Sequence, residues 1–262
     1  MKLISLLSIL LLLSSCAYFQ KMSGSDNIFK GHSPGSNNKK VSKTFLLTDK
    51  SGKFRVEREK GFNKSKNQFI VKKSVKGLDS GKELEKLVVI SKLGTIAGKL
   101  SVLKPSISEY SVWFEGKRYL SRMKVNSQQR SMEVTLKSPE KQWRGTRNFK
   151  FPSGQGVFCY FSQITECARA TGFLDKAIKN EGGSMKVFVI WEGYPYFQEQ
   201  YLNIPNSVFS SATFEYDGKN AKGQRRFTLK TSSQTVFYFV DEDSELEKKF
   251  WIAQGFSMVE VD

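Results

Sequence analysis

Three cysteines are the residues of this 262-residue chain whose type and spacing allow the clearest chemistry. Cys159 and Cys167 can form a disulfide, or they can remain two buried thiols. On one continuous helix their Cα atoms would be about 12 Å apart, which exceeds the separation of about 7 Å that a disulfide tolerates. A disulfide therefore requires the helix to begin after Cys159, near Ser162, with Phe158–Phe161 turning back onto it.

The third cysteine, Cys16, follows a short apolar run at the N-terminus. Met1-Lys2 is basic, and Leu3–Leu13 is apolar apart from two serines. As a helix this run would span about 16 Å, which is roughly half of a hydrocarbon core of about 30 Å. The pattern predicts a signal peptide rather than a transmembrane helix.

Leu13-Ser14-Ser15-Cys16 resembles the lipobox of bacterial lipoproteins, in which an aliphatic and two small residues precede the cysteine. The resemblance implies that the thiol of Cys16 takes a diacylglycerol group. It also implies that residues 1–15 are cleaved off and that the new amine is acylated, for example with palmitate. Ala17, where an Asp would favour inner-membrane retention, favours the outer membrane. The alternative is an ordinary secretory signal with an incidental cysteine.

Export would place the other two cysteines in an oxidising compartment, where an even pair favours a disulfide. Multiple acyl chains would anchor the protein stably to a membrane without crossing it. We therefore expect a lipid-anchored protein of the bacterial cell envelope, facing the periplasm from the outer membrane.

Motifs for most enzyme classes are absent from the sequence. No Gly-x-Ser-x-Gly, His-Glu-x-x-His, Walker-type or dinucleotide-binding glycine pattern occurs, and Pro152–Gly156 is better explained as a tight loop. The single histidine, His32, lies in a polar linker. The acidic cluster Asp241–Glu247 has oxygens that suit Ca²⁺, but it lacks a regular ligand spacing, so a solvated turn is the preferred interpretation. We expect no catalytic residue, metal or cofactor, and a hydrolase with two carboxylates is the less favoured alternative.

An aromatic segment provides the best candidate for a binding site. Trp191, Tyr194, Tyr196 and Phe197 surround a glycine and a proline that bend the chain. Aromatic side chains on loops stack on sugars or hold acyl chains, since they offer a large contact area. The alternative is a hairpin whose rings fill the core of a sheet.

The elements that must position these residues are mostly strands. Residues 16–40 are polar and predict a flexible tether, whereas residues 41–262 predict a β-rich domain, of which 41–84 is either a part or a separate basic strand region. Apolar and polar residues alternate in runs such as Lys53–Arg58 and Ser131–Lys137, which is typical of antiparallel strands with one wet face. Residues 162–180 instead predict one amphipathic helix with Ser162 as its N-cap.

The sequence therefore predicts a mainly β fold: a curved antiparallel sheet or incomplete barrel with the helix against its concave side. This outline is similar to the Lol-type carrier and receptor proteins of the Gram-negative periplasm, over about residues 85–262. The resemblance is one of architecture and address. It implies curved sheets that hold acyl chains against covering helices, and with them a lipid- or lipoprotein-handling role.

Charge is distributed unevenly along the chain. The net charge is +17, and Lys39–Lys86 holds 15 basic against 6 acidic residues, or +9, while Tyr238–Asp262 holds 2 against 7, or −5. A basic surface attracts anionic lipid, lipopolysaccharide or other envelope polyanions, although a solvated lysine-rich face explains the run equally well. Nucleic acid also attracts basic surfaces, but we do not expect it as a partner of an exported protein.

These observations favour a non-catalytic envelope lipoprotein that binds an amphiphile or an anionic envelope component. The alternative is a structural or assembly lipoprotein that docks onto another envelope protein. An apolar cavity inside the curved sheet would favour the first hypothesis, whereas a sheet filled by its own side chains would favour the second.

Overall fold

The computed structural model describes residues 40–98, 100–154 and 156–261. The predicted signal peptide, Cys16, His32 and the predicted tether as far as residue 39 lie outside these residues. No helix of the described part is both long enough and apolar enough to cross a membrane.

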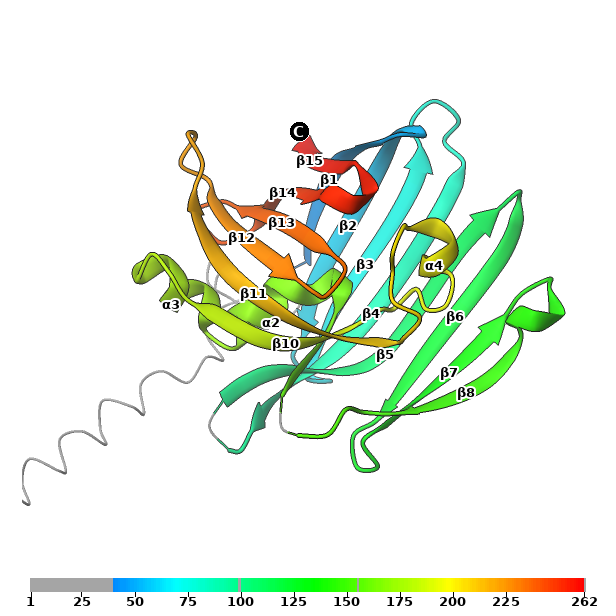
Figure 1. Ribbon diagram of the computed structural model, residues 1–262, viewed down its shortest axis with the longest axis horizontal. Coiled ribbons are helices and arrows are strands. Elements are labelled where there is room, and N and C mark those ends of the chain that lie inside the picture. The colour runs from blue at the N-terminus through cyan, green and yellow to red at the C-terminus, as the bar shows by residue number, and fades with distance from the viewer. Residues whose placement is uncertain (1–39, 99, 155, 262) are drawn as a thin grey trace, which may run out of the picture.

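A single sheet of fifteen strands dominates the described residues (Figure 1). The first eight strands are β1 (Lys40–Asp49), β2 (Gly52–Asn63), β3 (Gln68–Gly77), β4 (Glu83–Ile96), β5 (Leu100–Phe114), β6 (Lys117–Asn126), β7 (Ser131–Lys137) and β8 (Gly145–Lys150). The other seven are β9 (Val157–Tyr160), β10 (Ser184–Ile190), β11 (Phe209–Lys219), β12 (Arg225–Lys230), β13 (Thr235–Val240), β14 (Leu246–Trp251) and β15 (Phe256–Val261). The alternating runs Lys53–Arg58 and Ser131–Lys137 lie in β2 and β7, as predicted.

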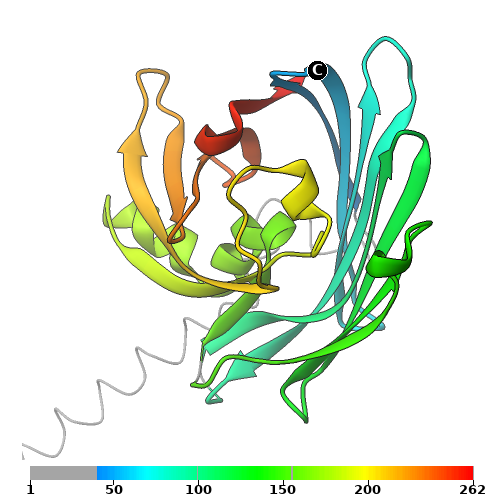
Figure 2. The ribbon, with the colours of Figure 1, turned by 45° about the vertical axis from the view of Figure 1, so that its right-hand side comes forward.

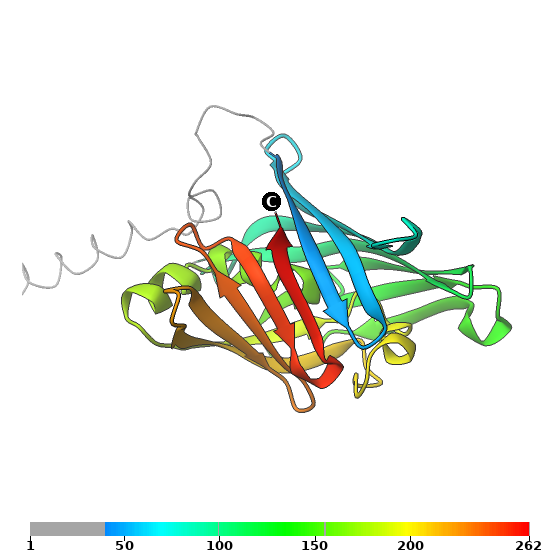
Figure 3. The same cartoon turned by 90° about the horizontal axis from the view of Figure 1, so that it is seen from above.

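The sheet is a meander in two halves that meet at β1 and β15. Its order is β8-β7-β6-β5-β4-β3-β2-β1-β15-β14-β13-β12-β11-β10-β9. Seen from above, the blue β1 and the red β15 lie side by side, and Thr44 is opposite Val261 (Figure 3). All neighbouring strands are antiparallel except β9 and β10, which are parallel. The first strand of the body and the last strand of the chain are thus central neighbours.

The sheet curves strongly without closing into a barrel (Figure 2). Strand β9, at one edge, packs against β5 and is largely buried, whereas β8 forms the other edge and is mostly exposed. Tucking β9 against β5 protects one row of unpaired backbone groups from solvent. The predicted curved antiparallel sheet with an incomplete barrel is therefore confirmed.

The single helix predicted over residues 162–180 is wrong in its continuity. A 3₁₀ turn, η3 (Phe161–Gln163), leads into α2 (Ile164–Ala170), and α3 (Phe173–Lys179) follows separately. Gly172 separates the two helices with φ of 72°, a left-handed conformation that glycine adopts without steric cost. The N-cap of α2 is Gln163 rather than Ser162, and its side chain makes no capping hydrogen bond.

Helix α2 is also not amphipathic, because every one of its residues is buried. It lies inside the curve of the sheet, against β5 and β9 (Figure 2). A helix surrounded by protein on all sides must bury its polar side chains as well, and buried charges require partners. Those partners are found on β2 and on the turn between β13 and β14.

Candidate functional site

A cavity of about 340 Å³ lies on the concave side of the sheet. Its volume is within the range of small-molecule pockets, about 300–1,000 Å³. The walls are mainly apolar and aromatic; residues that line them include Leu47, Phe54, Val56, Val71, Val75, Val112, Phe114, Phe161, Phe197, Tyr201, Tyr238, Trp251, Phe256 and Met258. The interior of the sheet is therefore not completely filled by its own side chains.

Strand alternation explains how these side chains reach one space. On β2, Phe54, Val56 and Arg58 are spaced by two residues and line the cavity. On the neighbouring strand β3, Val75 is opposite Val56 and Lys73 is opposite Arg58. Residues that face each other across a ladder project to the same side of a sheet. The register between β2 and β3 thus places apolar residues beside apolar residues, and basic residues beside basic residues, in this wall.

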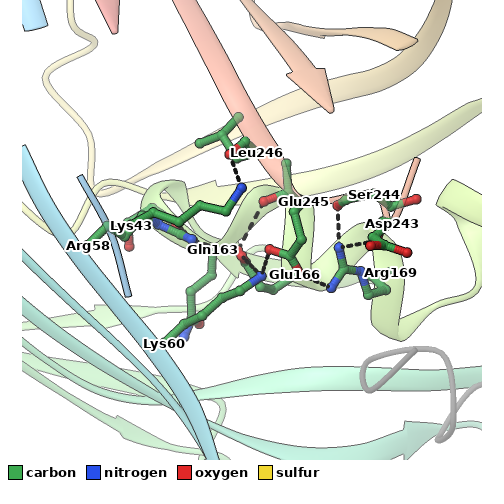
Figure 4. A network of polar contacts seen from close by, with 12 residues as sticks. Lys43, Arg58, Lys60, Gln163, Glu166, Arg169, Asp243, Ser244, Glu245 and Leu246 are labelled. Atoms are coloured by element: carbon green, nitrogen blue, oxygen red, sulfur yellow. Dashed lines mark hydrogen bonds and ion pairs between the residues drawn. The ribbon is translucent and has the colours of Figure 1, made fainter. Parts of the chain in front are cut away.

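Helix α2 lies at the end of the cavity that Arg58 lines, and a buried ion network holds it there (Figure 4). Arg58 donates from Nη2 to Glu166 Oε1 at 2.8 Å, and Lys60 Nζ is 3.5 Å from the same oxygen. Lys60 also pairs with Glu245, whose Oε1 accepts from Arg169 Nη1 at 2.7 Å. The network joins β2, α2 and the β13–β14 turn.

Electrostatics in this network favour ionised carboxylates. Burial alone would raise the pKa of Glu166, but the adjacent Arg58 and Lys60 outweigh it and lower that pKa to about 2. Burial likewise opposes ionisation of Glu245, whereas Lys60 and Arg169 lower its pKa below the ordinary value. Two carboxylates among three basic groups explain why α2 can be buried on all sides.

The acidic cluster at residues 241–247 is part of this arrangement, so it is not simply a solvated turn. Glu245 reaches into the network, and Asp241 Oδ1 accepts from the Glu245 N–H at 2.7 Å. Arg169 also donates from Nη2 to the backbone oxygen of Asp243 at 3.2 Å. Among the described residues, no group of three or more His, Cys, Asp or Glu side chains could hold a metal ion.

Glu85 and Glu192 are among the carboxylates that line the cavity, and both have partners. Glu85 pairs with Lys73, and the hydroxyl of Tyr201 donates to Glu85 Oε2 at 3.4 Å. Glu192 accepts the backbone N–H groups of Phe161 and Ser162 at 2.9 and 2.8 Å. Burial raises the pKa of Glu192 in spite of these hydrogen bonds. Its role is thus to hold the turn that precedes α2.

Lys249 is the cavity-lining cation without such a partner. Its Nζ lies 3.9 Å from the ring centroid of Phe161, 5.3 Å from that of Tyr238 and 5.6 Å from that of Trp251. With the residues that the structure describes, it makes neither an ion pair nor a hydrogen bond. Burial, with Lys73 nearby, lowers the pKa of Lys249 to about 7. The ammonium is held by aromatic faces alone.

The predicted binding segment lies mainly in the core. Trp191, Tyr194 and Tyr196 are buried and do not line the cavity, whereas Phe197, at the start of α4 (Phe197–Gln200), does. The ring of Tyr196 packs edge-on against Tyr119 at 5.5 Å. Three of the four predicted binding residues therefore fill the core beside β5–β8, as the alternative interpretation proposed. Only Phe197 of the four contacts the cavity.

The predicted disulfide is confirmed. Cys159 on β9 and Cys167 on α2 are bonded, with their Cα atoms 6.3 Å apart. The helix begins at Ile164, so it starts after Cys159 as the distance argument required. The bond fixes α2 to the edge strand β9.

The basic run in Lys39–Lys86 is divided between the two faces of the sheet. Lys72 and Lys40 pair with Glu59, and Lys76 pairs with Glu57, all partly exposed. Arg58, Lys60 and Lys73 instead point to the concave side; Lys60 is in the ion network, and the other two line the cavity. The run is therefore not one continuous basic surface.

Sequence reasoning missed most of the charged residues that line the cavity, among them Arg58, Lys73, Glu85, Glu192 and Lys249. A signal existed in the alternation: Lys73 stands between Val71 and Val75, in phase with both. A charge in phase with the apolar residues of a strand points to the buried face.

Comparison with known proteins gives little further information. No protein-family model matches the chain, and no curated protein matches it. Among solved structures, it is similar to the crystal structure of a beta-barrel-like protein of the domain of unknown function DUF1849 from Brucella abortus. The two share 10% identity at a TM-score of 0.44, over 84% of this chain and 93% of the other. A likeness at this level carries no functional information.

Proposed function

We propose that this chain is a non-catalytic lipoprotein of the bacterial cell envelope whose body binds an amphiphile inside its curved sheet. The observation that carries the proposal is the cavity of about 340 Å³ with mainly apolar and aromatic walls. Such walls release water when they receive an acyl chain, which is favourable in proportion to the apolar area buried. Unlike a filled core, they leave space for that chain.

The proposed cellular location of the protein rests on the sequence. Leu13-Ser14-Ser15-Cys16 matches a lipobox, and Cys16 would carry the membrane anchor. The disulfide Cys159–Cys167 is compatible with an oxidising compartment such as the periplasm. We place the protein at the outer membrane, facing the periplasm, where amphiphiles are abundant.

Native mass spectrometry of the full chain, extracted from membranes and freed of detergent, tests the proposal. We expect one amphiphile per chain as a mass that collisional activation removes. A covalently attached acyl group would stay, which separates the ligand from the anchor. Absence of a removable mass, both as purified and after addition of phospholipid or fatty acid, would refute the proposal.

Two variants make the test specific for the cavity. Val71→Phe adds a ring to a side chain that lines the cavity, whereas Val88→Phe makes the same change on β4 at a side chain that is not part of the lining. We expect loss of the bound mass in the first variant only, with unchanged circular dichroism in both. A stoichiometric protein partner without lipid would instead support the structural or assembly alternative.

A further inference from the structure

The charges that line the cavity differ in how completely they are neutralised. Among the residues that the structure describes, six charged side chains line it: Asp49, Arg58, Lys73, Glu85, Glu192 and Lys249. A charge buried away from water is costly unless it has a partner of opposite sign or several hydrogen bonds. Five of the six meet this requirement within the protein.

Their partners are of three kinds. Arg58 and Lys73 each form an ion pair, with Glu166 and Glu85 respectively. Glu192 is satisfied by two backbone N–H groups. Asp49, in the β1–β2 turn, accepts the backbone N–H groups of Ser51 and Gly52 at 2.7 and 3.1 Å.

Lys249 is the exception among the six. Its ammonium has three N–H donors, and the groups around it are the rings of Phe161, Tyr238, Trp251 and Phe256, at 3.9 to 6.0 Å. Aromatic faces attract a cation but accept hydrogen bonds poorly compared with a carboxylate. The cavity therefore holds one cation that an incoming anion can neutralise.

We propose that the amphiphile is anionic, and that Lys249 binds its headgroup as an ion pair while the apolar walls hold its chain. The inference rests on the proposed function and adds the class of ligand. The ligand class is a single acidic headgroup, such as a carboxylate, sulfonate or phosphate, on an apolar chain. A fatty-acid carboxylate carries one negative charge, which Lys249 alone can neutralise, whereas a phosphate headgroup can carry two.

Neighbouring charges set the conditions under which Lys249 can act. Lys73 and Arg58 face it from β3 and β2, and Glu85 and Glu192 from β4 and the loop after β10. Since the pKa of Lys249 is lowered to about 7, its side chain is largely protonated at pH 6 and largely neutral at pH 8.5. Anion affinity should fall as the pH rises through this range.

The test compares two probes with the same chain, decane-1-sulfonate and decan-1-ol, below their aggregation concentrations. Binding to the full chain is followed by the fluorescence of its tryptophans, of which Trp251 and Trp113 line the cavity. At pH 6 we expect the sulfonate to bind about tenfold or more tightly than the alcohol. This preference should shrink at pH 8.5, because the sulfonate stays ionised while Lys249 loses its proton.

Lys249→Met removes the charge and keeps a flexible apolar side chain that packs well on aromatic rings. We expect it to lose the preference for the sulfonate and to bind the alcohol as the wild type does. The matched control is Lys248→Met, because Lys248 also stacks on a ring, Phe250 at 4.4 Å, but does not line the cavity. This control should keep the wild-type preference.

The outcomes separate the two proposals. Binding of neither probe by the wild type would overturn the proposed function itself. Equal binding of both probes, or a preference that survives Lys249→Met, would leave the amphiphile cavity in place and overturn the role of Lys249. A preference that is equally lost in Lys248→Met would assign it to surface charge and would also overturn the role of Lys249.

Discussion

Gly193 lies where the chain leaves β10 and turns toward α4. A Cβ atom at this position would be 2.0 Å from Cδ1 of Phe197. The ring of Phe197 is itself packed edge-on against Tyr110 at 5.1 Å and against Tyr201 at 5.2 Å. Because Phe197 is buried among these rings and lines the cavity, it has little freedom to move away.

Gly193→Ala should therefore destabilise the fold by about 1–3 kcal/mol, the usual cost of overpacking a core. For a chain of this size that corresponds to a decrease in Tm of roughly 2–4 °C per kcal/mol. Thermal unfolding followed by circular dichroism measures the effect. Gly182→Ala is the control, because the nearest atom to its added Cβ is 3.9 Å away. Equal melting temperatures for the two variants would contradict the packing argument.

Among the elements, α2 is notable for being fixed by polar links rather than by an apolar stripe. The disulfide joins it to β9, Glu166 joins it to β2, and Arg169 joins it to the β13–β14 turn. Gly172, in a left-handed conformation, separates it from α3. Helix α2 is thus the element that connects both halves of the sheet from inside.

Removing the disulfide should loosen this element measurably. The chain-entropy model gives about 2.5 kcal/mol for so short a loop, so Cys159→Ser with Cys167→Ser should lower the free energy of unfolding by up to this amount. Urea unfolding with and without reductant checks it. The wild type should respond to reductant and the double variant should not. An unreduced mass that matches two free thiols at these positions would contradict the disulfide.

Loss of the charge at Glu166 should be more costly than loss of the disulfide. Glu166→Gln keeps the shape of the side chain but leaves Arg58 and Lys60 with one carboxylate fewer inside the protein. Breaking a buried ion pair typically costs about 3–5 kcal/mol. Urea unfolding at neutral pH measures the difference. Glu83→Gln is the control, because its pair with Lys86 is partly exposed and should contribute little.

At the scale of the whole molecule, stability should depend on pH through the buried network. The pKa of Glu166 is about 2 in the folded protein, against an ordinary value of 4.5. Its contribution is therefore fully present above about pH 4.5 and is lost as the pH falls toward 2. We expect urea midpoints to fall steeply over this range, and to fall less steeply in Glu166→Gln. Parallel profiles for the two proteins would contradict the assignment.

Much of the fold could be predicted from the sequence, because alternation and turn residues are local signals. The curved sheet and the disulfide follow from such signals together with a distance limit. The cavity could not be predicted, because its walls come from strands far apart in the chain. Lys249 and Lys73 share this space only after β14 and β3 have curved around α2, and alternation gives the face of a strand but not what lies opposite it. The spacing of apolar residues predicts helix within residues 162–180, but it does not show that the chain adopts a left-handed conformation at Gly172, which divides this region into α2 and α3.

The pairing of β1 with β15 has a consequence for how the protein is made. Thr44 and Val261 are opposite each other although 217 positions separate them in the chain, so the central seam of the sheet cannot form before the last strand has been synthesised. Contacts of such long sequence separation slow folding, since a large loop must be closed before they stabilise anything. The two halves of the sheet can therefore join only after β15 has been synthesised. Because the cavity walls come from both halves, the cavity closes only when β15 pairs with β1.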